Sequence, residues 1–118
     1  MPVAAMKKTR HAPIKTGPPT RFQRFGREHP AVIRAYEALS AATHRAGPLN
    51  GKTRALVKLG IAIGTWREGA VHSHTRKALE AGCSPDEIRH AVLLATTTLG
   101  FPSMMGALTW VEDILSGK

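Results

Sequence analysis

The hydrophobic positions of this chain follow a helical period from residue 29 onward. Four apolar residues recur at the spacing of one helix face: Val32, Ile33, Tyr36 and Leu39. Pro30 suits the first turn of a helix, and the sequence "RAGPLN" then breaks the pattern. We therefore predict a first helix over residues 30–45.

Residues 51–66 are apolar on nearly every side of a second predicted helix. The apolar side chains of "GKTRALVKLGIAIGTW" are Leu56, Val57, Leu59, Ile61, Ala62, Ile63 and Trp66. Asn50 can cap this helix, which we expect to be central and buried. Gly60 and Gly64 would let a neighbouring helix approach closely. Because only four other helices are available to cover it, we expect part of its surface to face another subunit.

Three more helices follow along the chain. A helix over residues 70–81 ends at Gly82, which suits a left-handed cap. The motif "SPDE" predicts the next helix start, with Ser84 as the cap and Glu87 closing a capping box. Its apolar stripe is Ile88, Ala91, Val92, Ala95 and Leu99. After "GFPS", a last helix over residues 104–115 turns Met104, Leu108, Val111 and Leu115 inward. No alternating strand pattern is present, so we predict an all-α bundle of about five helices.

The N-terminal residues 1–28 differ in composition from the rest. They hold seven Lys or Arg and one acid, a net charge of +6 out of +9, and four prolines. We expect a flexible basic arm without helix or strand, followed by a helical domain over residues 29–118. The arm can be solvated, embrace another subunit or anchor nucleic acid. The last interpretation is the weakest, and we expect no nucleic-acid partner.

The overall composition is that of one globular domain. The 118 residues are 42% hydrophobic and 21% charged. Cys83 is the only cysteine and cannot form an internal disulfide, which is typical of the cytoplasm. The chain lacks both the roughly 18-residue apolar run of a membrane span and the apolar stretch of a secretory signal. We expect a cytoplasmic protein without membrane contact.

His72 and His74 stand close together in "WREGAVHSHTRKALEAG" and raise the question of a metal site. Residues two apart on a helix point about 160° away from each other. Imidazoles that share a metal on one helix lie three or four residues apart. With one cysteine and no other acid–histidine cluster at ligand spacing, we expect no metal site.

Each of these histidines lies at one edge of the apolar stripe of its helix. His74 is bordered by alanines, which leave space that suits a pocket. His72 can pair with Glu68 at i,i+4 if the helix begins early enough. Two interpretations stay open for both: a structural boundary histidine, or an acid/base group, because an imidazole titrates near neutral pH.

Several motifs between residues 30 and 116 occur together in a known order. They are "KTR" opening an apolar helix, Glu68 and His74 six apart, "HxxxALxAG", "SPDEI" opening a helix, and "GFP" before the last helix. In this combination the chain resembles the carboxymuconolactone decarboxylase family, within the superfamily of AhpD-like proteins. The resemblance implies an all-helical fold whose subunits form trimers or hexamers, with pockets near the subunit contacts.

One branch of that family uses thiols. It carries a Cys-x-x-Cys pair before the histidine that matches His74, and a proton-relaying glutamate on the preceding helix. Here Arg67 and Ala70 stand at the cysteine positions and Ala55 at the glutamate position. Because Cys83 also has no partner thiol, we expect no thiol peroxidase or disulfide reductase activity.

The other branch is similar to the lactone decarboxylase of aromatic catabolism, which lacks the cysteine pair and keeps residues matched by His74 and Glu68. It implies a lyase that protonates the carbanion or enolate left when a carboxylated lactone loses carbon dioxide. The resemblance makes His74 the acid/base, Glu68 a group that orients an imidazole, Arg67 a carboxylate contact and His72 a lesser catalytic candidate. We expect no cofactor. The alternative is a non-catalytic, oligomeric binding or scaffold protein of the same fold.

Overall fold

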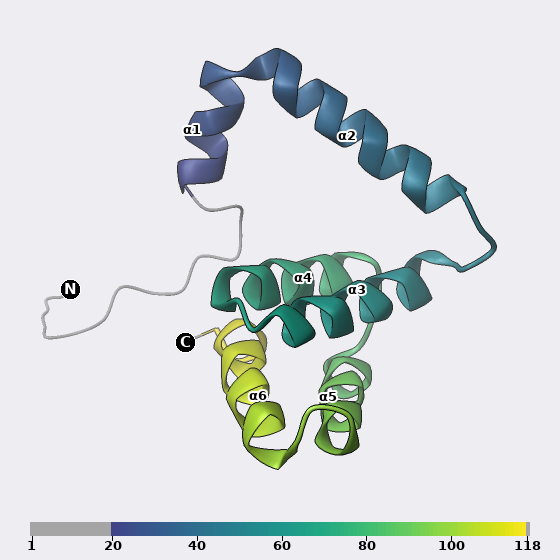
Figure 1. The fold of residues 1–118 in the computed structure, drawn as a ribbon, viewed down its shortest axis with the longest axis vertical. Coiled ribbons are helices and arrows are strands. Elements are labelled where there is room, and N and C mark those ends of the chain that lie inside the picture. The colour runs from purple at the N-terminus through teal and green to yellow at the C-terminus, as the bar shows by residue number, and fades with distance from the viewer. Residues whose placement is uncertain (1–19, 118) are drawn as a thin grey trace, which may run out of the picture.

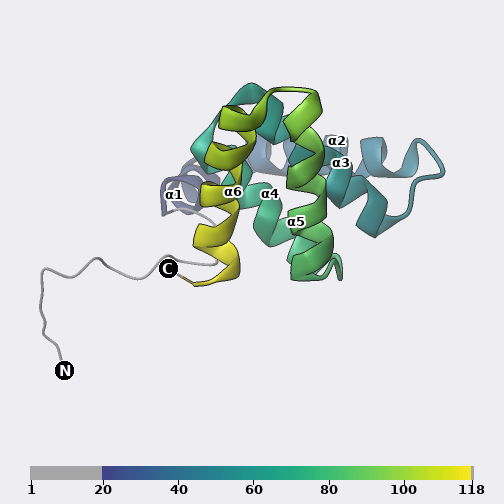
Figure 2. The ribbon, with the colours of Figure 1, turned by 90° about the horizontal axis from the view of Figure 1, so that it is seen from below.

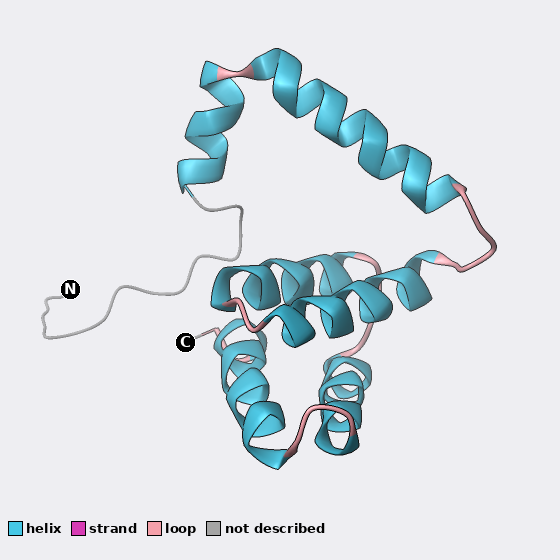
Figure 3. Ribbon diagram, viewed as in Figure 1, coloured by secondary structure: helices cyan, strands magenta, loops and turns pink. Residues whose placement is uncertain are grey.

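The structure, a computed structural model, describes residues 20–117, and all its regular elements are helical (Figures 1 and 3). In chain order they are α1 (Thr20–Glu28), α2 (Pro30–Arg45), α3 (Gly51–Thr65), α4 (Glu68–Glu80), α5 (Pro85–Leu93), the 3-10 turn η1 (Leu94–Thr97) and α6 (Phe101–Leu115). The all-α class is therefore confirmed. No helix in this part of the chain is long and apolar enough to cross a membrane.

The local signals for helix ends act as predicted. Asn50 accepts a hydrogen bond from the backbone N–H of Thr53 at 2.9 Å. Ser84 and Glu87 form the reciprocal capping box at the start of α5. Gly82 ends α4 with φ +97°, a conformation that favours glycine.

The core lies among α3, α4, α5 and α6. Figures 1 and 2 show α3 and α4 side by side, with α5 and α6 packed beneath them. The largest fully buried side chains are Leu59, Ile63, Ile88, Val71, Val92, Val111 and Thr75. The Thr75 hydroxyl donates to the backbone oxygen of Val71 at 2.7 Å, so its burial leaves no donor unpaired.

The turn between α3 and α4 is fixed against α6 by aromatic packing. Trp66 adopts φ +58° and its ring centroid lies 4.6 Å from that of Trp110. A Cβ on Gly106 would lie 2.5 Å from the Trp66 ring, so only glycine leaves room for this ring. This contact sets where α4 begins relative to α6.

Two helix boundaries differ from the predictions because of local chemistry. The helix predicted to run from Pro85 to Leu99 changes into η1 at Leu94, where three threonines follow one another. The Thr96 hydroxyl donates to the backbone oxygen of Leu93 at 2.7 Å, and such bonds compete with the helix. Leu99 is consequently 43% exposed rather than inward. The last helix begins at Phe101, three residues earlier than predicted.

The expectation of no helix within residues 1–28 is wrong for residues 20–28. All four prolines of the arm precede Thr20, so α1 is free of them. An ion pair between Arg24 and Glu28 at 3.2 Å, spaced i,i+4, supports this helix. Residues 1–19, which carry the rest of the predicted arm, lie outside the described residues.

Within the described residues the second predicted helix, α3, is buried on one side only, and the expectation that the rest of its surface faces another subunit stays a prediction. Only Leu59, Ala62 and Ile63 of α3 are buried, while Val57 is 46% and Ile61 62% exposed. A Cβ on Gly60 or Gly64 would meet nothing within 4 Å, so the expected close helix approach does not occur within the described chain.

The apolar stripe of α2 is similarly uncovered. Val32, Tyr36 and Leu39 are each more than half exposed. Figure 1 shows α1 and α2 arching away from the body formed by α3–α6. The first predicted helix therefore has its predicted bounds, but the core lies elsewhere.

Candidate functional site

His74 is partly buried on α4, with the positive charges of Lys77 and Lys58 acting on it. Burial lowers the pKa of His74 below its ordinary value of 6.5, and the charge of Lys77 followed by that of Lys58 lowers it further. Loss of water and nearby positive charge both disfavour the protonated imidazole. The lowered pKa favours the neutral form of His74, which can accept a proton.

His44 brings a second imidazole from α2 to the same group of side chains. Nζ of Lys58 lies 3.1 Å from Nε2 of His44, so the ammonium donates to a neutral ring nitrogen. Loss of surrounding water and then the charges of Lys58, Arg54 and Lys77 lower the pKa of His44. We call His44, Arg54, Lys58, His74 and Lys77 the basic cluster.

Arg54 adds a donor with spare capacity to the basic cluster. Its Nη1 donates to the backbone oxygen of Leu49 at 2.6 Å. Its Nε is buried and has no hydrogen-bond partner among the described residues. A buried guanidinium N–H without an acceptor favours an arriving oxygen anion.

A hollow of about 380 Å³ opens beside the basic cluster. Its lining comes from α1, α2 and α4: Phe22, Tyr36, Glu37, Ser40, Ala41, His44 and Lys77. The charged side chains of this lining are Glu37 and Lys77, and His44 is its imidazole. The hollow therefore adjoins the basic cluster through His44 and Lys77, while His74, Lys58 and Arg54 are not among its lining residues.

His72 lies in a different environment from His74. Its Nε2 is 3.0 Å from Oδ2 of Asp113 on α6 and 3.9 Å from Oε2 of Glu68. The helix begins at Glu68, so the i,i+4 pair that required an early start is confirmed. Glu68 therefore accompanies His72, while the charges acting on His74 are those of lysines.

Arg67 caps α4 with its backbone but makes no side-chain capping bond. It is exposed, and the positive charges that act on His74 come from Lys77 and Lys58. The structure thus separates the four residues named from the sequence. His74 belongs to the basic cluster. Glu68 and His72 lie near Asp113, and Arg67 lies at the N-terminal end of α4.

Sequence reasoning missed Lys58, His44 and Asp113. A signal existed for Lys58, because it is the charged residue that interrupts the apolar run from Leu56 to Ile63. His44 and Asp113 gave none, since each is an ordinary polar position on an amphipathic helix. Their importance depends on which helices pack together.

Cys83 is buried in an environment that does not favour thiol chemistry. Its Sγ lies 3.6 Å from the backbone oxygen of Lys52. Burial, followed by the charge of Glu87, raises the pKa of the Cys83 thiol, which opposes formation of the thiolate.

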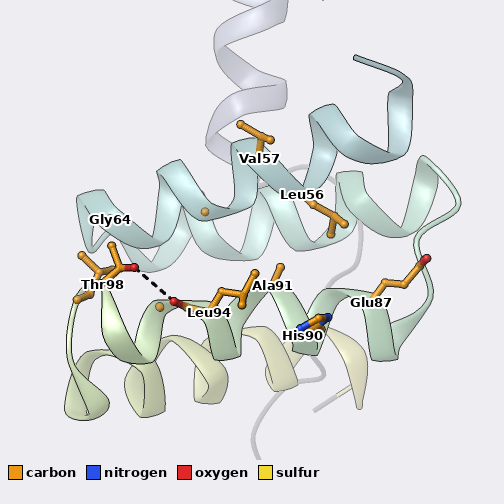
Figure 4. Close-up of a pocket in the computed structure, with 11 residues that line it drawn as sticks. Leu56, Val57, Gly64, Glu87, His90, Ala91, Leu94 and Thr98 are labelled. Carbon is orange, nitrogen blue, oxygen red and sulfur yellow. Dashed lines mark hydrogen bonds between the residues drawn. The ribbon is translucent and has the colours of Figure 1, made fainter. Parts of the chain in front are cut away.

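A second, larger hollow of about 720 Å³ runs between α3 and α5 (Figure 4). Its lining is mainly apolar: Leu56, Val57, Gly60, Gly64, Glu87, His90, Ala91, Leu94, Ala95, Thr98 and Leu99. We call it the α3–α5 groove. Val57 and Gly64 on α3 and Leu94 on η1 are exposed, so the groove is open to solvent along these residues.

Comparison with protein-family models identifies one family for this chain. A family model described as "Carboxymuconolactone decarboxylase family" matches residues 30–113. An uncharacterized protein from Haemophilus influenzae is 35% identical over 57 residues, which make up 48% of this chain and 50% of that protein. The match therefore spans about half the length of this curated relative.

A solved structure has a similar fold. It is an apo structure of a carboxymuconolactone decarboxylase family protein from Legionella pneumophila, with a TM-score of 0.69 and 23% identity. The similarity covers 82% of this chain and 87% of that chain. At this identity it speaks for the fold alone.

Proposed function

Because the chain belongs to the carboxymuconolactone decarboxylase family, we propose that it performs thiol-independent acid–base chemistry of the carboxy-lyase type. The substrate is a small carboxylated lactone or a related acid, of the kind met in aromatic catabolism. The observation that carries this proposal is the half-buried His74, whose pKa is lowered by burial and by the charges of Lys77 and Lys58.

A substrate carboxylate is the anion that this arrangement suits. Lys58 and Lys77 offer ammonium donors beside His74, and Arg54 adds its positive charge at His44. A bound carboxylate also offsets part of the positive charge that lowers the pKa of His74. Substrate binding therefore favours the imidazolium that the reaction needs as a proton donor.

The proposed reaction breaks one carbon–carbon bond. As carbon dioxide leaves, the bonding electron pair stays on the substrate carbon as a carbanion or enolate. The imidazolium of His74 donates its proton to that carbon, and solvent returns a proton to the neutral ring. Lys58 and Lys77 stabilise the negative charge as it develops.

The other named residues have weaker support in this scheme. Glu68 and His72 pair with each other beside Asp113, so the proposal gives them no direct contact with a substrate at His74. In this proposal Arg67 contacts a substrate carboxylate from the exposed start of α4, and Lys58 is the more important carboxylate contact. Cys83 is a bystander, and a buried cysteine without a disulfide suits a cytoplasmic protein.

Replacing His74 with glutamine tests the acid/base role. We expect kcat for carbon dioxide release from carboxymuconolactone-type substrates to fall by about 10²–10⁴-fold. His29→Gln is the matched control, because His29 is an exposed imidazole outside the basic cluster, and it should keep full activity. Undiminished turnover by His74→Gln would exclude the assignment.

The second candidate function is non-catalytic binding or scaffolding by a homo-oligomer. The observation that favours assembly is the uncovered apolar surface on α3 and α2, together with the open α3–α5 groove. Gly60 and Gly64 leave room there for a helix that residues 20–117 do not supply. We propose that a second copy of the chain covers this face.

The two candidates are separable by ligand tests. A panel of small carboxylic and lactone acids that gives neither turnover nor a rise in Tm would favour the scaffold function. A rise in Tm without turnover indicates a binding protein, and turnover that depends on His74 indicates the lyase.

A further inference from the structure

Three potential ligand groups converge between α4 and α6, on a different side of α4 from the basic cluster. Nε2 of His72 is 3.0 Å from Oδ2 of Asp113 and 3.9 Å from Oε2 of Glu68. One ligand atom from each residue lies within 4.8 Å of the other two. In a tetrahedral zinc site with bonds of about 2.0–2.1 Å, ligand atoms are about 3.3 Å apart. The observed separations need only small side-chain rotations to reach this value.

We propose that Glu68, His72 and Asp113 form a binding site for a first-row divalent cation, with Zn²⁺ or Co²⁺ as the fitting type. This departs from the sequence-based expectation of no metal site, which rested on the spacing of His72 and His74, on the single cysteine and on the lack of another acid–histidine cluster at ligand spacing. It does not depend on the lyase chemistry proposed at His74.

The charge of the three groups matches such a cation. Two carboxylates carry a charge of −2 and a neutral imidazole adds none, so a divalent ion makes the site neutral. The chain as a whole carries +9, which makes a local concentration of negative charge notable. One nitrogen and two oxygen ligands favour zinc-like ions over Mg²⁺ or Ca²⁺, which prefer oxygen alone.

The packing holds two of the ligands and leaves the third adjustable. The side chain of His72 is 16% exposed and that of Asp113 31%, at a junction that the Trp66–Trp110 contact fixes. Glu68 is 58% exposed, on the first turn of α4 and one turn before His72. An ion can therefore enter from solvent and draw Glu68 inward.

The same contacts also fit a simpler role, in which the His72–Asp113 pair only ties α4 to α6. Metal binding distinguishes the two roles. An ion pair needs no cation, and its residues would show no stoichiometric affinity for Co²⁺ or Zn²⁺.

The test is a titration of the full-length protein, with any affinity tag removed, with Co²⁺ followed by visible absorption and with Zn²⁺ followed by calorimetry. We expect one ion per chain and a rise in Tm with Zn²⁺. Asp113→Asn and Glu68→Gln should weaken binding by at least about tenfold. His29→Gln and His74→Gln should bind as the wild type does.

Two outcomes would overturn the site. One is the absence of saturable binding at one ion per chain. The other is affinity that is unchanged in both Asp113→Asn and Glu68→Gln. Glu68 is mostly exposed, so its variant should fold even if Asp113→Asn does not, and circular dichroism checks both. Because His74→Gln binds metal in this scheme, loss of lyase activity and loss of metal binding are independent results.

Discussion

Replacing Ile61 with alanine tests whether a second copy of the chain covers the outer face of α3. Leu59 provides the matched comparison, because it lies two residues away on the same helix. Leu59 is fully buried and Ile61 is 62% exposed. The two substitutions remove similar apolar side chains from opposite environments.

The expected magnitudes follow from burial. Leu59→Ala should lower the free energy of unfolding by about 2–5 kcal/mol, because it removes buried methyl groups and leaves a cavity. In an isolated chain, Ile61→Ala should change it by less than about 0.5 kcal/mol. Full burial of an isoleucine is worth about 1.5–3 kcal/mol, so covering its exposed 62% adds about 1–2 kcal/mol per subunit.

The assay is urea unfolding at two protein concentrations, combined with sedimentation to count subunits. If a second copy covers α3, wild-type stability rises with protein concentration and Ile61→Ala reduces that rise. Leu59→Ala should be destabilising at both concentrations.

The reasoning fails in two distinguishable ways. An oligomer whose subunit affinity is unaffected by Ile61→Ala would place the subunit contact elsewhere. If the protein is a monomer and Ile61→Ala lowers its free energy of unfolding as much as Leu59→Ala does, the packing of α3 described above is contradicted.

The remaining predictions concern the basic cluster and a helix cap. Lys58→Met should raise the pKa of His74, measured by NMR titration, because it removes a positive charge that lowers it, and an unchanged value would place Lys58 too far away. The same variant should raise KM for a carboxylated substrate more than it lowers kcat if Lys58 binds the ground-state carboxylate. The pKa of His74 is lower in the folded chain than its ordinary 6.5, so the folded state binds fewer protons than the unfolded state. The free energy of unfolding therefore falls as the pH drops below 6.5. When the pH is lowered from 7.5 to 5.5, the free energy of unfolding measured with urea should thus fall more for the wild type than for His74→Gln. An equal fall would contradict the lowered pKa. Ser84→Ala should lower the free energy of unfolding by about 0.5–2 kcal/mol, because it removes the acceptor for the Glu87 backbone N–H, and Ser103→Ala in the first turn of α6 serves as control.

Local order was predictable because it depends on neighbours in the chain. The caps at Asn50 and Ser84 and the left-handed Gly82 each act within four residues, so sequence alone identified them. The buried residues of α4, which are Val71, Thr75 and Ala78, lie three or four residues apart, as one face of a helix requires. The failures at Leu99 and at α1 were local too, since consecutive threonines and the end of a proline run decided them.

Burial of the longer apolar helices was not predictable in the same way. A pattern states which faces are apolar, but it does not state which of them the chain covers. Val57 and Ile61 are as hydrophobic as Leu59 and Ile63, yet only the latter pair is buried. The number of covering elements and their positions decide this, and both are tertiary properties.

By itself the sequence determined the all-α class, most helix bounds, the family and the choice of His74. Only the tertiary structure placed Lys58 and His44 near His74, and Asp113 beside His72, 41 residues away in the chain. The physical reason is range: hydrogen bonds that begin and end helices join near neighbours. Electrostatic groups form wherever packing brings distant helices together, so their membership follows from the fold.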